Sequence, residues 1–132
     1  MSNHENLIGN RRTYYAENLN ETYAEDDDRA EVDPADPATN LISSEEVGTD
    51  MHLPVIDLDF PCSLVPSATP GHFHLYLGKP ITWTAYQRLL EALCEAGIVE
   101  RGFCNLSLER GASFVRHPDH PKAPRRQNND KF

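Results

Sequence analysis

The chain has few apolar residues, few basic residues and no long hydrophobic run, and each shortage excludes a class of protein. Of its 132 residues, 39% are hydrophobic and 8% are aromatic, which excludes a large core. No apolar run approaches the ~18 residues of a membrane span, and the N-terminus lacks the apolar region of a signal peptide. The length also excludes a two-domain enzyme. We therefore expect one small domain at most and no membrane partner.

Cysteine is also scarce, with 3 residues at positions 62, 94 and 104 and no Cys-x-x-Cys pair. An odd number cannot pair completely within one chain, so we expect free thiols. Free thiols suit a reducing compartment, and we expect a cytoplasmic protein, in the host cell cytoplasm if the protein is viral. A zinc site built from Cys62, His72, His74 and Cys104 lacks the close ligand spacing that is typical of zinc motifs.

Acidic residues outnumber basic ones, and the excess lies in the first part of the chain. Residues 1–50 hold 13 acidic and 3 basic residues, residues 51–132 hold 8 and 9, and the net charge is −9. Residues 25–37 combine dense charge with two prolines, which disfavours regular structure. We therefore expect residues 1–50 to form a long disordered acidic arm. Two interpretations of this arm stay open, a solubilising tail or a segment that binds a partner or mimics a nucleic acid.

Residues 51–117 have the apolar periodicity of a compact domain. Residues 55–60 and 72–77 each alternate apolar and polar side chains, as strands do, and a turn-rich loop separates them. A helix is expected between a Thr82 cap and Gly97. Its apolar stripe comprises Tyr86, Leu89, Leu90, Leu93 and Cys94.

Two further strands are expected over residues 103–108 and 112–116, with a turn between them. The resulting β-β-α-β-β order predicts an α+β fold, a small antiparallel sheet with one amphipathic helix on its apolar face. Residues 118–132 form a basic, proline-rich tail, which is able to touch phosphates but is more often solvated chain.

The alternation places Asp57 and Asp59 on one face of the first expected strand, and His72 and His74 on one face of the second. If the two strands pair over a shared buried face, these four side chains lie together on the opposite face. Paired carboxylates suit Mg²⁺ or Mn²⁺, which also bind substrate phosphates. A solvated polar sheet face is the alternative interpretation.

The small residues just before the second expected strand allow backbone amides to approach an anion. An ordinary connecting loop is the alternative. Together, these segments resemble the archaeo-eukaryotic primase (primase-polymerase) superfamily in a reduced form, and the pattern is similar to that of short proteins from actinobacterial phages. Residues 55–60 resemble the family's Asp-x-Asp strand. Residues 67–76 resemble its nucleotide-contacting turn and histidine strand, and residues 114–122 resemble a late motif.

The resemblance implies a domain that binds a divalent metal and a nucleotide or nucleic acid in DNA replication. If it is active, the reaction is metal-dependent nucleotidyl or phosphoryl transfer. The catalytic residues would be Asp57, Asp59 and His72, with Asp57, Asp59 and Glu100 as the candidate metal ligands. The implied nucleotide and phosphate contacts are Ser67, Thr69, Gly71, His74, Arg116 and Lys122. The alternative prediction is a non-catalytic interaction protein that binds a host or phage protein through its acidic arm.

Overall fold

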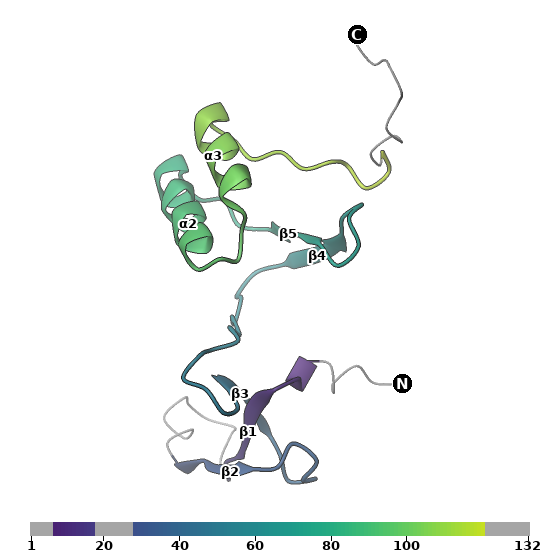
Figure 1. Cartoon of the computed structure of the whole chain (residues 1–132), viewed down its shortest axis with the longest axis vertical. Coiled ribbons are helices and arrows are strands. Elements are labelled where there is room, and N and C mark those ends of the chain that lie inside the picture. Colours follow the sequence, from purple (N-terminus) through teal and green to yellow (C-terminus); the bar gives the residue numbers. More distant parts are fainter. Residues whose placement is uncertain (1–6, 18–27, 121–132) are drawn as a thin grey trace. The chain divides into compact units, whose positions relative to one another are not determined.

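The computed structural model describes residues 7–17 and 28–120, which are coloured in Figure 1. The chain divides into two compact units, Met1–Asp57 and Leu58–Phe132. Within the described residues, small antiparallel sheets and two helices build these units, which confirms the α+β class. Among the described residues, no helix is both long enough and apolar enough to cross a membrane.

The first unit is a three-stranded antiparallel sheet in the order β2-β1-β3. Its strands are β1 (Arg11–Tyr15), β2 (Ala30–Val32) and β3 (Leu41–Glu46). The centre of this sheet is Thr13, which pairs with Val32 on one side and Ile42 on the other. Thr13 is 1% exposed, and its hydroxyl donates a 2.9 Å hydrogen bond to the Val32 carbonyl. A polar residue thus occupies the position where a larger domain would place an apolar one.

The expectation of a disordered arm does not hold for these three strands. Side-chain hydrogen bonds hold the backbone where apolar burial is scarce. The Asn40 amide donates to the Ala16 carbonyl at 2.8 Å and accepts from the Ala16 N–H at 3.0 Å. The carboxylates of Asp33 and Asp36, beside the two prolines, accept from the N–H groups two residues later and so form turns. The start of the acidic run, residues 25–27, lies outside the described residues together with residues 18–24.

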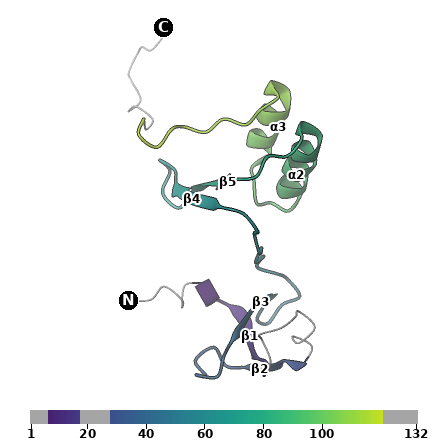
Figure 2. The same cartoon turned by 180° about the vertical axis from the view of Figure 1, so that it is seen from behind.

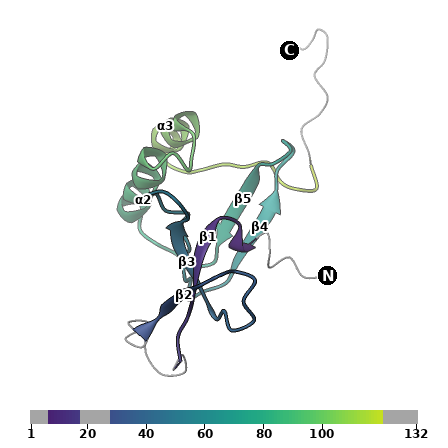
Figure 3. The same ribbon diagram turned by 60° about the horizontal axis from the view of Figure 1, so that its bottom comes forward.

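The second unit begins with a hairpin of β4 (Cys62–Pro66) and β5 (Phe73–Leu77), seen from another side in Figure 3. The predicted strand over residues 72–77 is present as β5, but its partner is β4. The predicted strand over residues 55–60 is wrong, because the structure describes these residues and assigns none of them to a strand. Residues 67–72 close a short turn, which favours the nearer partner in sequence. Gly71 accommodates the turn with a φ of +80°.

The helix after the hairpin follows the sequence prediction closely. Helix α2 spans Trp83–Glu95, and its N-cap Thr82 accepts a 3.1 Å hydrogen bond from the Ala85 N–H. Gly97 follows the C-cap with a φ of +77°. The Ile98 N–H then donates to the Leu93 carbonyl at 2.9 Å, which closes the last turn. Both predicted helix boundaries are confirmed.

A second helix replaces the two predicted C-terminal strands. Helix α3 spans Arg101–Arg110, and Figure 2 shows it beside α2. Residues 112–116 are described and contain no strand, so the predicted β-β-α-β-β order is wrong at this end. The alternation of residues 103–108 is misleading, because the buried side chains are Cys104 and Ser107, three positions apart. That spacing marks one face of a helix.

The buried side chains of the second unit lie on its two helices, α2 and α3. The helices contact each other, and each contributes a buried apolar side chain, Leu90 from α2 and Cys104 from α3. A chain of hydroxyls adds to this contact. The Tyr86 hydroxyl donates to Ser113 at 2.7 Å, and Ser113 donates to the buried Ser107 at 2.7 Å. Helix α2 therefore packs against a helix, and the prediction that it covers the apolar face of a sheet is wrong, since the large apolar side chains of the hairpin are exposed.

Candidate functional site

The structure does not bring the two aspartates and two histidines into one group. Asp57 and Asp59 lie in the segment that precedes β4, and the boundary between the two units falls between them. His72 closes the hairpin turn, whereas His74 lies within β5 opposite Val65. Within residues 7–17 and 28–120, no three His, Cys, Asp or Glu side chains are grouped as metal ligands. The pairing of β5 with β4 removes the geometric basis for a shared site.

The predicted anion-binding loop is the turn of the hairpin. The Ser67 N–H donates to the His72 carbonyl at 2.9 Å, and the His72 N–H donates to the Thr69 carbonyl at 3.0 Å. The Thr69 N–H donates to the Ser67 hydroxyl at 3.1 Å. These three amides bond within the turn itself. The arrangement therefore favours the interpretation as an ordinary connecting loop.

The remaining predicted site residues lie in separate places. Glu100 is the N-cap residue of α3, and its side chain makes no capping hydrogen bond. Arg116 is exposed in the extended segment after α3. Lys122 lies outside the described residues. Within the part of the chain that the structure describes, none of these residues joins Asp57 or Asp59 in a group of metal ligands.

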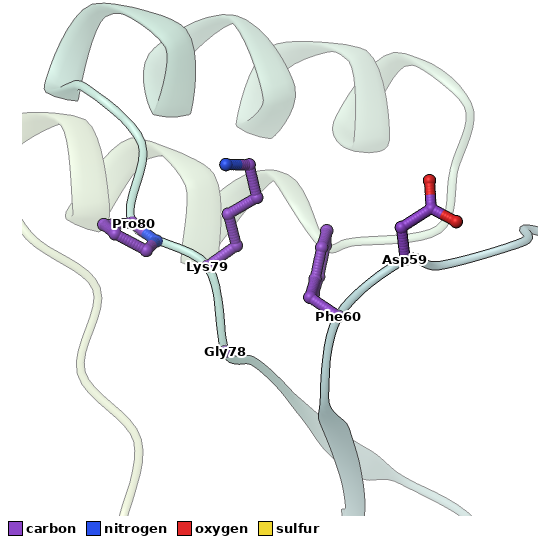
Figure 4. A pocket seen from close by; sticks show the side chains of 5 residues that line it. All are labelled: Asp59, Phe60, Gly78, Lys79 and Pro80. Carbon is purple, nitrogen blue, oxygen red and sulfur yellow. The ribbon is translucent and has the colours of Figure 1, made fainter.

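A shallow hollow of about 490 Å³ lies where the chain enters β4 and leaves β5, and Figure 4 shows its lining. The side chains of Asp59 and Lys79 stand on either side of Phe60. The Gly78 N–H donates a 2.8 Å hydrogen bond to the Pro61 carbonyl, which holds the two ends of the hairpin together. A carboxylate and an ammonium group at one hollow suit a ligand that carries both charges, or a cation with its phosphate.

Sequence reasoning selected Asp59 for a different reason and missed Lys79. The residues Gly78, Lys79 and Pro80 resemble an ordinary connection between a strand and a helix. The sequence could have indicated Lys79 only if the strand partner of β5 had been predicted correctly, because the pairing of β4 with β5 brings residue 59 near residue 79.

A hydrogen bond with a resolved effect on two pKa values joins Tyr14 and Glu45 on neighbouring strands. The Tyr14 hydroxyl donates to the Glu45 carboxylate. This hydrogen bond lowers the pKa of Glu45 and raises the pKa of Tyr14, and burial raises the latter further. The bond requires an ionised carboxylate and a protonated phenol. It therefore stabilises the sheet above the ordinary pKa of a glutamate and is lost as the pH falls through the lowered pKa of Glu45.

Substitution of Tyr14 by phenylalanine is expected to raise the pKa of Glu45 toward its ordinary value, because the main cause of the depression is removed. Carboxyl-carbon NMR across an acid titration measures this pKa directly. The matched control is Tyr15→Phe, since side chains of adjacent residues in β1 point to opposite faces. A Glu45 pKa that is unchanged by Tyr14→Phe would show that the hydroxyl contact does not form in solution.

The three arginines of the first unit are all engaged within it. Arg11 donates to the Leu7 carbonyl at 2.6 Å and to the Leu53 carbonyl at 3.4 Å. Arg12 forms a 3.3 Å ion pair with Glu31, and the Arg29 guanidinium lies 5.4 Å from the centre of the Tyr14 ring. These cations are held by backbone carbonyls, by one carboxylate and by one aromatic face. Arg12 is paired with a carboxylate, and the 13 acidic residues of 1–50 outnumber the 3 basic residues of that stretch with every guanidinium charge counted.

All three cysteines are free, which confirms the expectation from their number. Cys62 is exposed on β4, whereas Cys104 is buried between the helices. Burial raises the pKa of the Cys104 thiol. That thiol is consequently a protonated packing group, and Cys62 is the thiol most accessible to reagents.

Comparison with known proteins gives no further assignment. No protein-family model matches the chain, no curated protein matches its sequence, and no solved structure matches its fold. The functional argument therefore rests on the residues and on the geometry described above.

Proposed function

We propose that the chain is a non-catalytic interaction protein whose acidic first unit binds a positively charged surface of another protein. The observation that carries this proposal is the charge of residues 1–50, where 13 acidic residues stand against 3 basic ones, and Arg12 is already paired with Glu31. Acidic side chains at the turns stay on the surface, with Asp33 and Asp50 exposed and Asp36 half-buried. Complementary charge steers a partner toward such a surface and selects against acidic partners.

Amide substitutions test this proposal without disturbing the turns. The triple variant Asp33→Asn/Asp36→Asn/Asp50→Asn removes three charges, and asparagine keeps the side-chain oxygen that accepts from Ala35 and Ala38. The probe is a fluorescent lysine-rich peptide, whose binding is followed by anisotropy at low and high salt. We expect the variant to bind about tenfold more weakly, since three rim charges each contribute ~0.5 kcal/mol.

The control removes the same number of charges from the second unit. The variant Glu95→Gln/Glu100→Gln/Glu109→Gln alters three exposed acidic residues of that unit and has the same net charge as the test variant. It is expected to bind the peptide about as tightly as the wild-type chain. Equal weakening by the two variants would mean that the peptide responds to total charge, and the proposal would fail.

A second candidate function is primase-like binding of a divalent cation and a nucleotide, with nucleotidyl or phosphoryl transfer if the site is active. The observation that favours it is the hollow beside Asp59 and Lys79. In this proposal Asp59 holds Mg²⁺ or Mn²⁺, and the Lys79 ammonium contacts a phosphate of the nucleotide.

Calorimetric titration of Mn²⁺ into the full chain, with and without a nucleoside triphosphate, tests the second candidate. Saturable binding is expected in the wild type and is expected to disappear in Asp59→Asn. Asp119→Asn serves as the control, because it removes an exposed carboxylate elsewhere in the second unit. Heat that is identical in all three proteins would exclude the site.

A further inference from the structure

The hairpin has no formally charged side chain. Residues 60–78 contain no Asp, Glu, Lys or Arg, although 25% of the chain is charged. Residues that face each other across an antiparallel pair share one side of the sheet. The register therefore gathers one set of side chains, the apolar hairpin face, which consists of Cys62, Leu64, Pro66, Phe73, Leu75 and Leu77.

The apolar hairpin face is open to solvent. Leu64 is 63% exposed, Leu75 58%, Phe73 55% and Leu77 42%. These fractions correspond to roughly 400 Å² of apolar side chain, a patch size that on monomeric proteins is often functional. A two-stranded hairpin is only marginally stable in water by itself. The face therefore requires a cover.

The strand edges have little protection against pairing. In a two-stranded sheet each strand has one unpaired edge, and monomeric proteins commonly protect such edges with charged side chains. Neither β4 nor β5 contains one. The proline at the end of β4, Pro66, is the one residue of the two strands that lacks an N–H group.

Charge distinguishes between two candidate partners for this face, a second copy of the chain and a charged protein. Two copies of a chain with a net charge of −9 repel each other wherever their acidic residues meet. An uncharged surface allows two copies to approach without placing like charges in contact. A charged partner, in contrast, would find no complementary charge within residues 60–78. The face is also self-complementary, because rotation about a two-fold axis places leucine and phenylalanine against leucine and phenylalanine.

We propose that the apolar hairpin face packs against the same face of a second copy and forms a two-fold homodimer. Two sheets that pack in this way lie ~10 Å apart and interdigitate their side chains. The ~400 Å² of apolar side chain is about half of the area that each partner buries in a specific interface. The dimer therefore requires the side chains and backbone that border the face to supply the rest. This contact is separate from the acidic surface of the first unit.

The oligomeric state of the full chain tests this proposal. Sedimentation equilibrium in reducing buffer is expected to give twice the 14.9 kDa chain mass for the wild type. Leu75→Lys places a charge at the centre of the face and is expected to give the mass of one chain. The matched control is Leu106→Lys, which alters an exposed leucine on α3. This variant is expected to stay dimeric. A wild-type monomer at about 200 µM, or a folded Leu75→Lys dimer, would overturn the proposal.

A second measurement uses the wild-type chain and so does not depend on how a variant folds. Cys62 belongs to the apolar hairpin face and is exposed in the single chain. Its rate of reaction with a maleimide, followed by peptide mass spectrometry, is expected to fall about tenfold between ~1 µM and ~200 µM protein. A rate that does not change with concentration would contradict the dimer. Binding of the lysine-rich peptide is unaffected by either result, so the two proposals fail separately.

Discussion

Replacement of Leu90 by alanine is expected to lower the free energy of unfolding of the second unit by about 2–4 kcal/mol. Leu90 is 2% exposed and is the buried apolar side chain of α2, which contacts α3. The truncation removes three buried carbons and leaves a cavity that a small helix pair fills poorly. A domain of this size is stable by only about 4–11 kcal/mol, so the change removes a large share of its stability.

Trp83 offers a direct measurement of this effect. It is the 1 tryptophan of the chain, it begins α2, and its ring lies 5.7 Å from that of Tyr86. Urea unfolding followed by its fluorescence therefore reports the helix pair. The control is Leu89→Ala, since Leu89 is the preceding residue and is 37% exposed. It is expected to lose less than half as much, and equal losses would contradict the assignment of Leu90 to the core.

Substitution of Gly78 by alanine is expected to open the base of the hairpin. A Cβ atom at this position would lie 2.9 Å from the Pro61 carbonyl oxygen. That oxygen accepts the hydrogen bond from the Gly78 N–H, so relief of the clash also weakens the bond. Forced contacts of this kind destabilise by about 1–3 kcal/mol. The hollow beside Asp59 and Lys79 would widen with the same displacement.

Amide hydrogen exchange measures this second effect where tryptophan fluorescence does not. The N–H groups of Ser67 and His72 bond across the hairpin turn and report its opening. Their exchange is expected to accelerate about tenfold or more in Gly78→Ala, in line with a loss of ~1.4 kcal/mol or more. Gly102→Ala is the control, because its nearest contact would be 3.9 Å away. Its location in α3 favours alanine, so no acceleration is expected.

Local signals in the sequence predicted the structure well where neighbours in sequence determine it. Thr82 and Gly97 mark the two ends of α2 through hydrogen bonds that span only a few residues. The alternation of residues 72–77 likewise predicted β5. The partner of β5 was not predictable in the same way. Residues 55–60 have the alternation of a strand, but the segment that pairs with β5 is residues 62–66. Pairing depends on the closure of the turn, which alternation does not encode.

The first unit and α3 show two further limits of pattern analysis. Thr13, Asn40 and their neighbours stabilise a sheet through polar contacts, and these leave no hydrophobic periodicity in the sequence. Residues 103–108 alternate like a strand, although Cys104 and Ser107 face the interior of a helix pair. The candidate site depended on the strand pairing and changed with it. Asp59 lines the hollow, and the pairing of β4 with β5 brings Lys79 to the same hollow.

The uncharged hairpin and the acidic first unit give the chain two surfaces with opposite responses to ionic strength. Added salt shortens the Debye length to ~8–10 Å under physiological conditions, which reduces the repulsion between two acidic copies. The apolar attraction between hairpin faces does not weaken in the same way. The same salt weakens attraction between the first unit and a basic surface. If both proposals hold, dilute buffer is expected to favour single chains bound to a basic partner, whereas concentrated salt is expected to favour paired chains that have released it.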